Sequence, residues 1–388
     1  MLCVTDHTDE HHLTRVGVVG AGQLAFMMGE ASSSVGVSVT VLAASPDDPA
    51  ITTCEHAVIG DSHDVNAIDL LSRDVDVITF DHELVNLDDL AQLEHRGFIV
   101  RPSAASLRFA VDKAFQRQAL SDAGLAVPRF LAVGSSSDSR ASEFLDTLDG
   151  PPVLKAARGG YDGRGVLFPA DRVEAVAMID ELSATGDVLI EERLELLGEV
   201  AQLVVRGIDG AIELYPLVTT VQSDGMCVEV RVPAEVSTQL VDDASALGRK
   251  IATLIGVVGI LAIELFVTSA GLVINEVALR PHNSGHWTIE GAVTSQFANH
   301  LRAVSGQPLG DTSATQPFAV MVNLVGGEEP SSLDAAQSIP GALVHDYAKS
   351  WRPGRKLGHV TALGDDAQLA HVTAWKSARA YGTKTQET

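Results

Sequence analysis

A lysine followed by a run of glycines is the most informative combination in this 388-residue sequence. Lys155 falls inside the apolar stretch 152–157, where burying an ammonium group is unfavourable unless an anion or a carboxylate compensates its charge. Four glycines between positions 159 and 165 provide a backbone that can close over phosphate groups, and Arg158 and Arg164 lie beside them. The chain contains no Gly-Lys pair, so this is not a Walker loop. The stretch predicts a phosphate site; a flexible turn with Lys155 pointing outward is the alternative.

Two glutamates interrupt strongly apolar stretches further along the chain. Glu264 and Glu276 belong to two expected strands, and the connection 268–271 between them predicts a four-residue hairpin loop. Glu264 then faces Asn275, or Glu276 after a register change of one residue, so oxygen-bearing side chains converge in either case. Mg²⁺ takes a few protein oxygens and completes its shell with nucleotide phosphates. The pattern predicts a magnesium site, with exposure at a sheet edge as the alternative.

A glycine turn near the N-terminus directly follows an apolar strand. Residues 20–25 match G-x-G-x-x-A, a setting in which the amides at the start of a helix can hold a phosphate. A dinucleotide site also needs an acidic residue at the end of the second strand, and residues 39–44 contain none. A monophosphate site is therefore favoured over a dinucleotide site, and glycines that serve only packing are the alternative.

A polar segment holds two histidines four residues apart, His282 and His286, a spacing that suggests zinc when it occurs on a helix. Asn283, Ser284 and Gly285 between them favour a loop, and no third ligand is evident. We therefore interpret the segment as a polar substrate loop.

The charge of the chain restricts its partners. The sequence has 27 Lys and Arg against 51 Asp and Glu, a net charge of −24. Such a field repels phosphate backbones, which argues against nucleic acid and anionic membranes as partners. Any anionic substrate then needs a local basic cluster, and residues 349–359 concentrate five basic side chains, His359 included. A solvated basic face is the alternative for this run.

The compartment follows from cysteine usage and from the apolar runs. Three widely separated cysteines without CxxC spacing indicate a reducing environment. The N-terminus is polar and acidic, unlike a secretion signal. The longest uncharged apolar run, residues 251–263, is too short to cross a bilayer. We expect a cytoplasmic protein that contacts no membrane.

The order of the elements predicts an α/β protein of more than one domain. Apolar runs at 37–43, 75–80 and 98–100 alternate with helical stretches, the pattern of a doubly wound sheet. A helix from 104 onward is expected to carry Asp112, Lys113 and Arg117. A strand at 152–157 leads into the glycine run, and later strands at 188–192, 200–206, 212–217 and 226–232 suggest a large antiparallel sheet. A helix at 237–255, strands at 259–267 and 272–277, and a third region beyond 310 follow.

Together these motifs resemble the ATP-grasp superfamily, and within it the N5-carboxyaminoimidazole ribonucleotide synthetase family of purine biosynthesis. The most specific segments are 159–165, 275–290, 295–297 and 352–359. The resemblance implies a Rossmann-like preATP-grasp α/β domain at 15–103, a central α+β ATP-grasp domain at 104–310 and a small β-rich C-terminal domain at 311–377, with tails at 1–14 and 378–388. It also implies a homodimer with ATP between two lobes of the central domain.

The resemblance further implies a nucleotide site and a metal site. Glu264 and Glu276 would bind Mg²⁺, with Mn²⁺ as an alternative. ATP would contact Lys113 and Lys155 at its phosphates, the closing loop with Gly160, Tyr161, Asp162, Gly163, Arg164 and Gly165, the adenine segment with Glu191, Glu192 and Leu194, the ribose ligand Glu199, and Asn275 beside Glu276.

The implied reaction is the ATP-dependent carboxylation of aminoimidazole ribonucleotide (AIR) with bicarbonate, through carboxyphosphate. The implied catalytic residues are Lys155, Arg280, Asp162 and His282, and either of the last two would accept the amine proton. AIR and bicarbonate would be surrounded by Gln23, Leu24, Tyr161, Asp162, Arg280, His282, Asn283, Ser284, Lys349, Arg355 and Lys356.

The sequence departs from the family pattern at a few positions. Lys113 and Arg117 stand where the family usually has Arg and then Lys, an exchange that keeps the charges and changes the donor geometry. Gln222 stands where a histidine is common. Two alternatives to the carboxylation are another carboxylate-activating ligase, such as a formate-dependent glycinamide ribonucleotide transformylase, and a catalytically idle nucleotide-binding protein.

Overall fold

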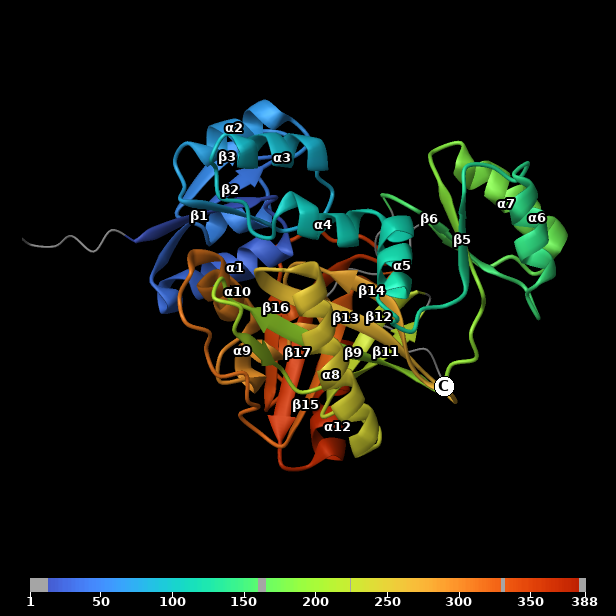
Figure 1. The fold of residues 1–388 in the computed structure, drawn as a ribbon. Coiled ribbons are helices and arrows are strands. Elements are labelled where there is room, and N and C mark those ends of the chain that lie inside the picture. The colour runs from blue at the N-terminus through green and yellow to red at the C-terminus, as the bar shows by residue number, and fades with distance from the viewer. Residues whose placement is uncertain (1–12, 160–164, 224, 329–331, 384–388) are drawn as a thin grey trace, which may run out of the picture.

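The computed structural model describes residues 13–159, 165–223, 225–328 and 332–383 (Figure 1). The N-terminal part is a parallel four-stranded sheet in the order β3-β2-β1-β4, as the alternation of strands and helices predicts. The expected strand at 98–100 contributes only one bridge, from Val100 to Ile78. The sheet and its helices comprise β1 (Thr14–Val19), α1 (Gln23–Val35), β2 (Val37–Ala43), the short η1 (Pro49–Thr52), β3 (His56–Ile59), α2 (Val65–Ser72), β4 (Val77–Phe80) and α3 (Leu87–His95).

The single helix expected after residue 104 is two helices, α4 (Ala104–Val111) and α5 (Lys113–Asp122). Asp112 breaks the helix because its backbone is extended, with φ −122° and ψ 96°. Its carboxylate accepts the amide of Phe115 and so caps α5. This break places Lys113 at the first position of α5.

A small four-stranded antiparallel sheet forms a lobe that projects from the rest of the molecule (Figure 1). Its order is β5-β8-β6-β7, and two helices cover it. The stretch 188–192 was expected in the large antiparallel sheet, but β8 pairs with β5 and β6 instead. The lobe comprises β5 (Phe130–Val133), α6 (Ser139–Asp146), β6 (Val153–Ala156), β7 (Val166–Leu167), α7 (Arg172–Ser183) and β8 (Val188–Glu191).

A nine-stranded sheet forms the largest part of the fold. Eight strands follow the order β14-β13-β9-β11-β12-β15-β17-β16, and β10 pairs with β9. The strands are β9 (Gly198–Arg206), β10 (Ile212–Leu214), β11 (Val218–Ser223), β12 (Met226–Val232), β13 (Gly259–Thr268), β14 (Gly271–Ala278), β15 (Phe318–Val325), β16 (Ala342–Asp346) and β17 (Lys356–Gly364). The associated helices are α8 (Thr238–Ile255), η2 (Asn283–Gly285), α9 (Thr288–Gly291), α10 (Gln296–Ser305), α11 (Leu333–Gln337) and α12 (Ala367–Tyr381).

The C-terminal region shares this sheet with the central region. Val230 on β12 pairs with Met321 on β15, so the boundary expected at 310 separates no sheets. The C-terminal boundary expected at 377 also differs, because α12 continues to Tyr381. Beyond it, Thr383 is buried and its hydroxyl accepts the amide of Val325.

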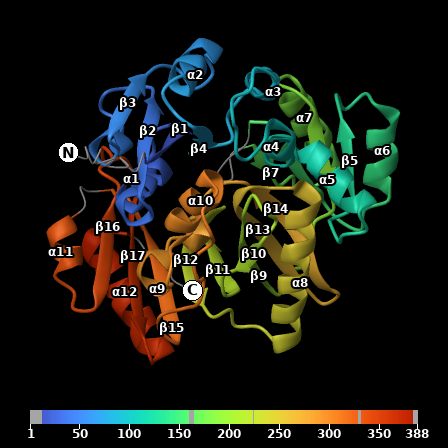
Figure 2. The same ribbon diagram turned by 60° about the vertical axis from the view of Figure 1, so that its left-hand side comes forward.

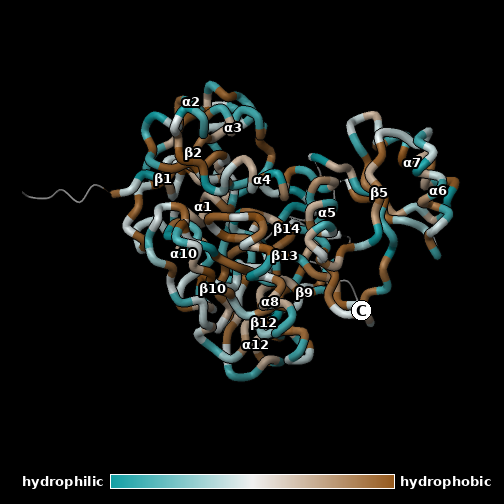
Figure 3. The backbone as a smooth tube through the Cα atoms, viewed as in Figure 1, coloured by the Kyte–Doolittle hydropathy of each residue, from teal (hydrophilic) through white to brown (hydrophobic). Residues whose placement is uncertain are grey.

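Hydrophobic packing joins the regions. Ile78, Leu107, Ile251 and Val277 belong to one core cluster that spans the N-terminal sheet, α4, α8 and β14. Helix α10 lies between α1 and the large sheet (Figure 2). Hydrophobic residues are concentrated along strands such as β5 and β13 (Figure 3). No helix in the described part of the chain combines the length and the apolar character needed to cross a membrane.

Candidate active site

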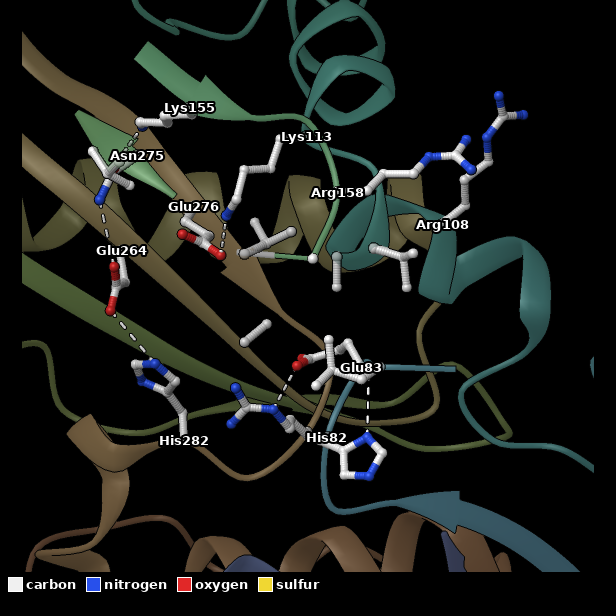
Figure 4. Close-up of a pocket in the computed structure, with 18 of the residues that line it drawn as sticks. His82, Glu83, Arg108, Lys113, Lys155, Arg158, Glu264, Asn275, Glu276 and His282 are labelled. Atoms are coloured by element: carbon white, nitrogen blue, oxygen red, sulfur yellow. Dashed lines mark hydrogen bonds and ion pairs between the residues drawn. The ribbon is translucent and has the colours of Figure 1, made fainter. Parts of the chain in front are cut away.

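One large pocket lies between the small sheet, the large sheet and the N-terminal domain (Figure 4). Residues 160–164, which include the expected loop residues Tyr161, Asp162 and Arg164, lie outside the described ranges. Of the other residues expected at the site, Gly165, Ser284, Lys349 and Arg355 do not line the pocket. Those that line it are Gln23, Leu24, Lys113, Lys155, Glu191, Glu192, Leu194, Glu199, Glu264, Asn275, Glu276, Arg280, His282, Asn283 and Lys356.

Lys155 on β6 is buried, and a carboxylate compensates its charge as the sequence predicts. Its Nζ lies 2.8 Å from Oε2 of Glu191 on β8 and donates to Oδ1 of Asn275 at 3.1 Å. Arg117 donates from Nε to the other Glu191 oxygen at 2.5 Å. Burial alone would raise the pKa of Glu191, but Arg117 and Lys155 outweigh it and hold this pKa below its usual value. The Glu191 carboxylate is therefore committed to two cations, and adenine would meet the backbone of this segment rather than that side chain.

The hairpin of β13 and β14 brings the two expected metal ligands together. Its loop contains two residues rather than four, because Thr268 already pairs with Gly271, whose φ of +114° suits glycine. Glu264 pairs directly with Glu276 across the strands. The next pair joins Leu265 to Ile274, so Asn275 is the extra residue of a β-bulge.

This bulge puts three oxygen-bearing side chains against the pocket. In a regular strand Asn275 and Glu276 would point to opposite faces. Here both line the pocket, and Asn275 Nδ2 lies 3.4 Å from Glu264 Oε2. Lys113 Nζ donates to Glu276 Oε1 at 2.5 Å. Both alternatives for the register therefore hold in part, because Glu276 faces Glu264 while Asn275 also reaches it.

The two carboxylates differ in their electrostatic surroundings. Burial, followed by the charges of Glu276 and Glu199, raises the pKa of Glu264 to about 7. Burial opposes ionisation of Glu276 as well, but Lys113 outweighs it and lowers the pKa of that group. Burial and the neighbouring carboxylates therefore favour the protonated form of Glu264, whereas Lys113 keeps Glu276 ionised. In the described residues, no group of three or more His, Cys, Asp or Glu side chains is arranged to hold a metal ion, so a cation here would depend on further oxygens from a ligand.

The polar segment after β14 reaches the same pocket. His282 Nε2 lies 3.4 Å from Glu264 Oε1, and its Nδ1 lies 2.9 Å from the Ser284 hydroxyl. Arg280 donates from Nε to Glu83 at 2.6 Å (Figure 4). His286 is fully buried and contacts Gln296 instead of pairing with His282. The two histidines of this described segment are therefore not arranged to bind one zinc ion, and the substrate loop stays a prediction.

The glycine turn of the N-terminal domain does not offer a vacant phosphate site. Asp81 accepts the amides of Gly22 at 2.5 Å and Ala25 at 3.2 Å, so its carboxylate already occupies the N-terminus of α1. A side chain at Gly22 would come within 2.7 Å of Asp81 Oδ2. A phosphate at this turn would therefore compete with an internal anion that already accepts two of its amides, and the monophosphate site stays a prediction. Gln23 and Leu24 nevertheless line the pocket.

The basic C-terminal segment contributes one of its residues directly to the pocket, Lys356. Lys349 contacts the side-chain oxygen of Gln23, and Arg355 donates to the Ser350 hydroxyl at 2.9 Å. These two side chains thus lie behind the pocket wall.

Two functional positions were not assigned from the sequence. Glu83 comes from the loop after β4 and reaches Arg280 only through the docking of two domains, which no local pattern indicates. Arg117 was noted in the sequence only because Lys113 and Arg117 exchange the positions of the usual Arg and Lys. Glu191 lies in an apolar strand, which indicates that this carboxylate needs cationic partners.

Family models match three consecutive parts of the chain. A ribonucleotide synthetase preATP-grasp domain matches residues 13–111, an ATP-grasp domain matches 118–297, and a phosphoribosylaminoimidazole carboxylase C-terminal domain matches 319–375. These matches follow the order of the three regions expected from the sequence.

Curated relatives and solved structures cover nearly the whole chain. N5-carboxyaminoimidazole ribonucleotide synthase of Mycobacterium bovis is 45% identical over 365 residues, covering 91% of this chain and 85% of the relative. That of Synechococcus elongatus is 38% identical, covering 89% and 88%.

A crystal structure of an ADP complex of purK, N5-carboxyaminoimidazole ribonucleotide synthetase, superposes with a TM-score of 0.89 at 30% identity, covering 97% of this chain and 99% of the other. An Aspergillus clavatus N5-carboxyaminoimidazole synthase in complex with ADP and 5-aminoimidazole ribonucleotide gives 0.87 at 28% identity, covering 96% and 99%. The chain therefore belongs to the N5-carboxyaminoimidazole ribonucleotide synthase family of ATP-dependent, ATP-grasp ligases.

Proposed function

We propose that this chain carboxylates the exocyclic amine of AIR with bicarbonate at the expense of ATP, as its family membership implies. The observation that carries the proposal is the carboxylate pair Glu264 and Glu276, which shares one pocket with Lys113, Lys155 and a separate group of cationic and polar side chains around Arg280. A nucleotide and an anionic acceptor can thus meet at one place.

In the first step, an oxygen of bicarbonate attacks the γ-phosphorus of ATP, and the bond from that phosphorus to the β,γ-bridging oxygen breaks. The products are carboxyphosphate and ADP. Lys155 and Lys113 would hold the phosphates and neutralise their charge, Glu192 and Leu194 border the place for adenine, and Glu199 that for ribose. Catalysis of such a transfer depends mainly on positioning and on fixed charges.

Glu264, Glu276 and the Asn275 amide fit a divalent cation such as Mg²⁺ or Mn²⁺. The fit rests on the donor set, because both carboxylates and the Asn275 side chain line one pocket and Glu264 pairs directly with Glu276. When bound, the cation would supply positive charge next to the transferred phosphoryl group. The remaining contributions come from the protein itself.

In the second step, the AIR amine forms a bond to the carboxyl carbon, phosphate leaves with the electron pair of the broken C–O bond, and the amine gives up a proton. His282 would accept that proton, with Ser284 and Glu264 in contact with its ring. Asp162, outside the described ranges, is the other candidate acceptor. Arg280 would bind bicarbonate, and Asn283 borders the same wall of the pocket.

The 5′-phosphate of AIR would meet Lys356, with Lys349 and Arg355 of the same basic segment behind it. The net charge of −24 makes such a local cluster necessary for an anionic substrate. We also propose a homodimer in the cytoplasm; the two described cysteines, Cys54 and Cys227, are free thiols, as a reducing compartment requires. Light scattering on the purified chain tests the dimer.

The assay that tests the function measures ADP release with three acceptor mixtures. We expect release with AIR plus bicarbonate to exceed that with glycinamide ribonucleotide plus formate and that without acceptor. Higher release with the formate mixture would favour the transformylase, and no release in any mixture would favour an idle nucleotide-binding protein.

A further inference from the structure

We propose that Arg117 is a positioning residue that sets the distance between Lys155 on the small sheet and the Asn275–Glu276 bulge on the large sheet. The proposal rests on the proposed function, because those residues are taken to hold the nucleotide phosphates and the cation. Arg117 itself does not line the pocket.

The guanidinium of Arg117 contacts three different elements while only 1% exposed. Its Nε donates to Glu191 on β8 at 2.5 Å, and its Nη2 donates to the backbone carbonyl of Asn275 on β14 at 2.5 Å. Its Nη1 donates to the neighbouring Gln116 side chain at 3.0 Å. A planar, rigid group of five N–H donors can make these contacts at once, which an ammonium cannot reproduce.

The contact with Asn275 supports the bulge. Because Asn275 is the extra residue of β14, it has no partner of its own in the register with β13. A partly buried carbonyl is stabilised by a donor, and at this bulge the donor comes from outside the hairpin. Arg117 provides it, and the bulge in turn brings Asn275 and Glu276 together to the pocket.

The contacts close into a ring across the pocket wall. Arg117 binds Glu191, Glu191 binds Lys155, Lys155 donates to the Asn275 side chain, and the Asn275 carbonyl accepts from Arg117. Two members of the ring come from the small sheet, one from the large sheet, and Arg117 from α5. Loss of the guanidinium removes the contacts of Arg117 with both sheets. The distance between Lys155 and the carboxylate pair would then no longer be fixed.

The test compares Arg117→Lys and Arg117→Met with the control Arg140→Lys. Arg140 lies on α6 in the lobe of the small sheet, and its side chain is 64% exposed beside Asp138. The methionine variant leaves Glu191 and Lys155 as a balanced pair, so it keeps the core neutral if the lysine variant fails to fold. Circular dichroism and thermal unfolding establish the fold of each variant.

We expect both Arg117 variants to raise the KM for ATP and to weaken the calorimetric Kd for Mg²⁺–ADP by about tenfold or more. The KM for AIR should stay within about twofold, because the side chains facing AIR come from other elements; about tenfold is 1.4 kcal/mol and about twofold 0.4 kcal/mol. The control should match the wild type. A folded Arg117 variant with unchanged Mg²⁺–ADP affinity overturns the proposal, as does an equal loss for ATP and AIR.

These readouts separate the inference from the function on which it rests. If wild-type protein releases no ADP with AIR and bicarbonate, the proposed function fails. The calorimetric comparison still measures whether Arg117 positions the nucleotide site, since it needs no turnover.

Discussion

Two clusters of charge lie next to each other in the pocket wall, and they are built in opposite ways. On the small sheet, the single carboxylate of Glu191 binds two cations, Lys155 and Arg117. On the large sheet, Glu264 and Glu276 share one close lysine, Lys113. Cationic partners lower the pKa of Glu191 against its burial, whereas burial and neighbouring carboxylates raise the pKa of Glu264 to about 7.

The difference separates a structural cluster from one that needs a ligand. The Glu191 cluster is compensated by the chain alone, and Glu191 is only 2% exposed. The Glu264–Glu276 pair faces the pocket, and burial disfavours the ionised form of Glu264, so a cation brought with a nucleotide would stabilise both carboxylates. Loss of the carboxylate should therefore mainly lower stability at the first cluster and mainly impair chemistry at the second.

The largest expected effect is on stability, at the compensated cluster. Glu191→Gln should lower the free energy of unfolding by about 3 to 5 kcal/mol, because two buried cations lose their carboxylate. Urea denaturation at pH 7.5 measures this change. The matched control is Glu192→Gln, whose partner Arg129 is 49% exposed, and it should cost less than about 1 kcal/mol. Equal losses in the two variants would contradict the assignment of the Glu191 cluster.

At the other cluster, Glu276→Ala should lower kcat for ADP release at least about 100-fold while leaving the fold intact. The variant removes a carboxylate expected to hold the cation and frees Lys113 from its partner. Steady-state turnover with AIR and bicarbonate, together with circular dichroism, checks both parts. Glu213→Ala on β10, an exposed carboxylate away from the pocket, should behave as the wild type. Normal turnover of Glu276→Ala would rule out the metal assignment.

The dependence of stability on pH tests the same difference between the two clusters in the absence of any ligand. The folded pKa of Glu264, about 7, lies above its usual value of 4.5, so between these values the native state holds a proton that the unfolded state releases. Stability should therefore fall by about 2 to 3 kcal/mol as the pH rises from 4.5 to beyond 7. Urea denaturation in EDTA from pH 5 to pH 8 measures the slope.

Glu264→Gln should flatten that slope and be more stable than the wild type at pH 8, although it loses turnover. Glu213→Gln should keep the wild-type slope. Destabilisation by Glu264→Gln at pH 8 would show that the pair, like the Glu191 cluster, is compensated by the chain.

The smallest expected effect concerns a cationic side chain near the carboxylate pair, that of Lys356. Lys356 lines the pocket and lowers the pKa of Glu264, which opposes the dominant effect of burial. Lys356→Met should raise the KM for AIR about tenfold, equivalent to about 1.4 kcal/mol, by removing a charge from its phosphate site. Steady-state kinetics with AIR as the varied substrate tests this, with the exposed Arg352→Met from the same segment as the control. An unchanged KM for Lys356→Met would remove this residue from the phosphate site.

Much of the site was predictable because its residues conflict with their local surroundings. Lys155, Glu264 and Glu276 are charged residues inside apolar strands, and such a conflict persists only where a partner or a ligand resolves it. Their alternation with β-branched residues also predicted the strands that hold them. The break of the helix at Asp112 was missed, because an aspartate is compatible with either a cap or a helix interior until its partners are known.

The kinds of side chain, the strands that hold them and the family to which the motifs belong can all be read from the amino-acid order. Which partner each charge meets depends on how distant elements pack. The contact of Asp81 with α1 and the contacts of Arg117 with Glu191 and Asn275 join residues 56 to 158 positions apart. The bulge at Asn275 follows from the register of one hairpin. Local periodicity reports which face of an element is apolar, but the register of a hairpin and the docking of separate elements depend on packing over the whole fold.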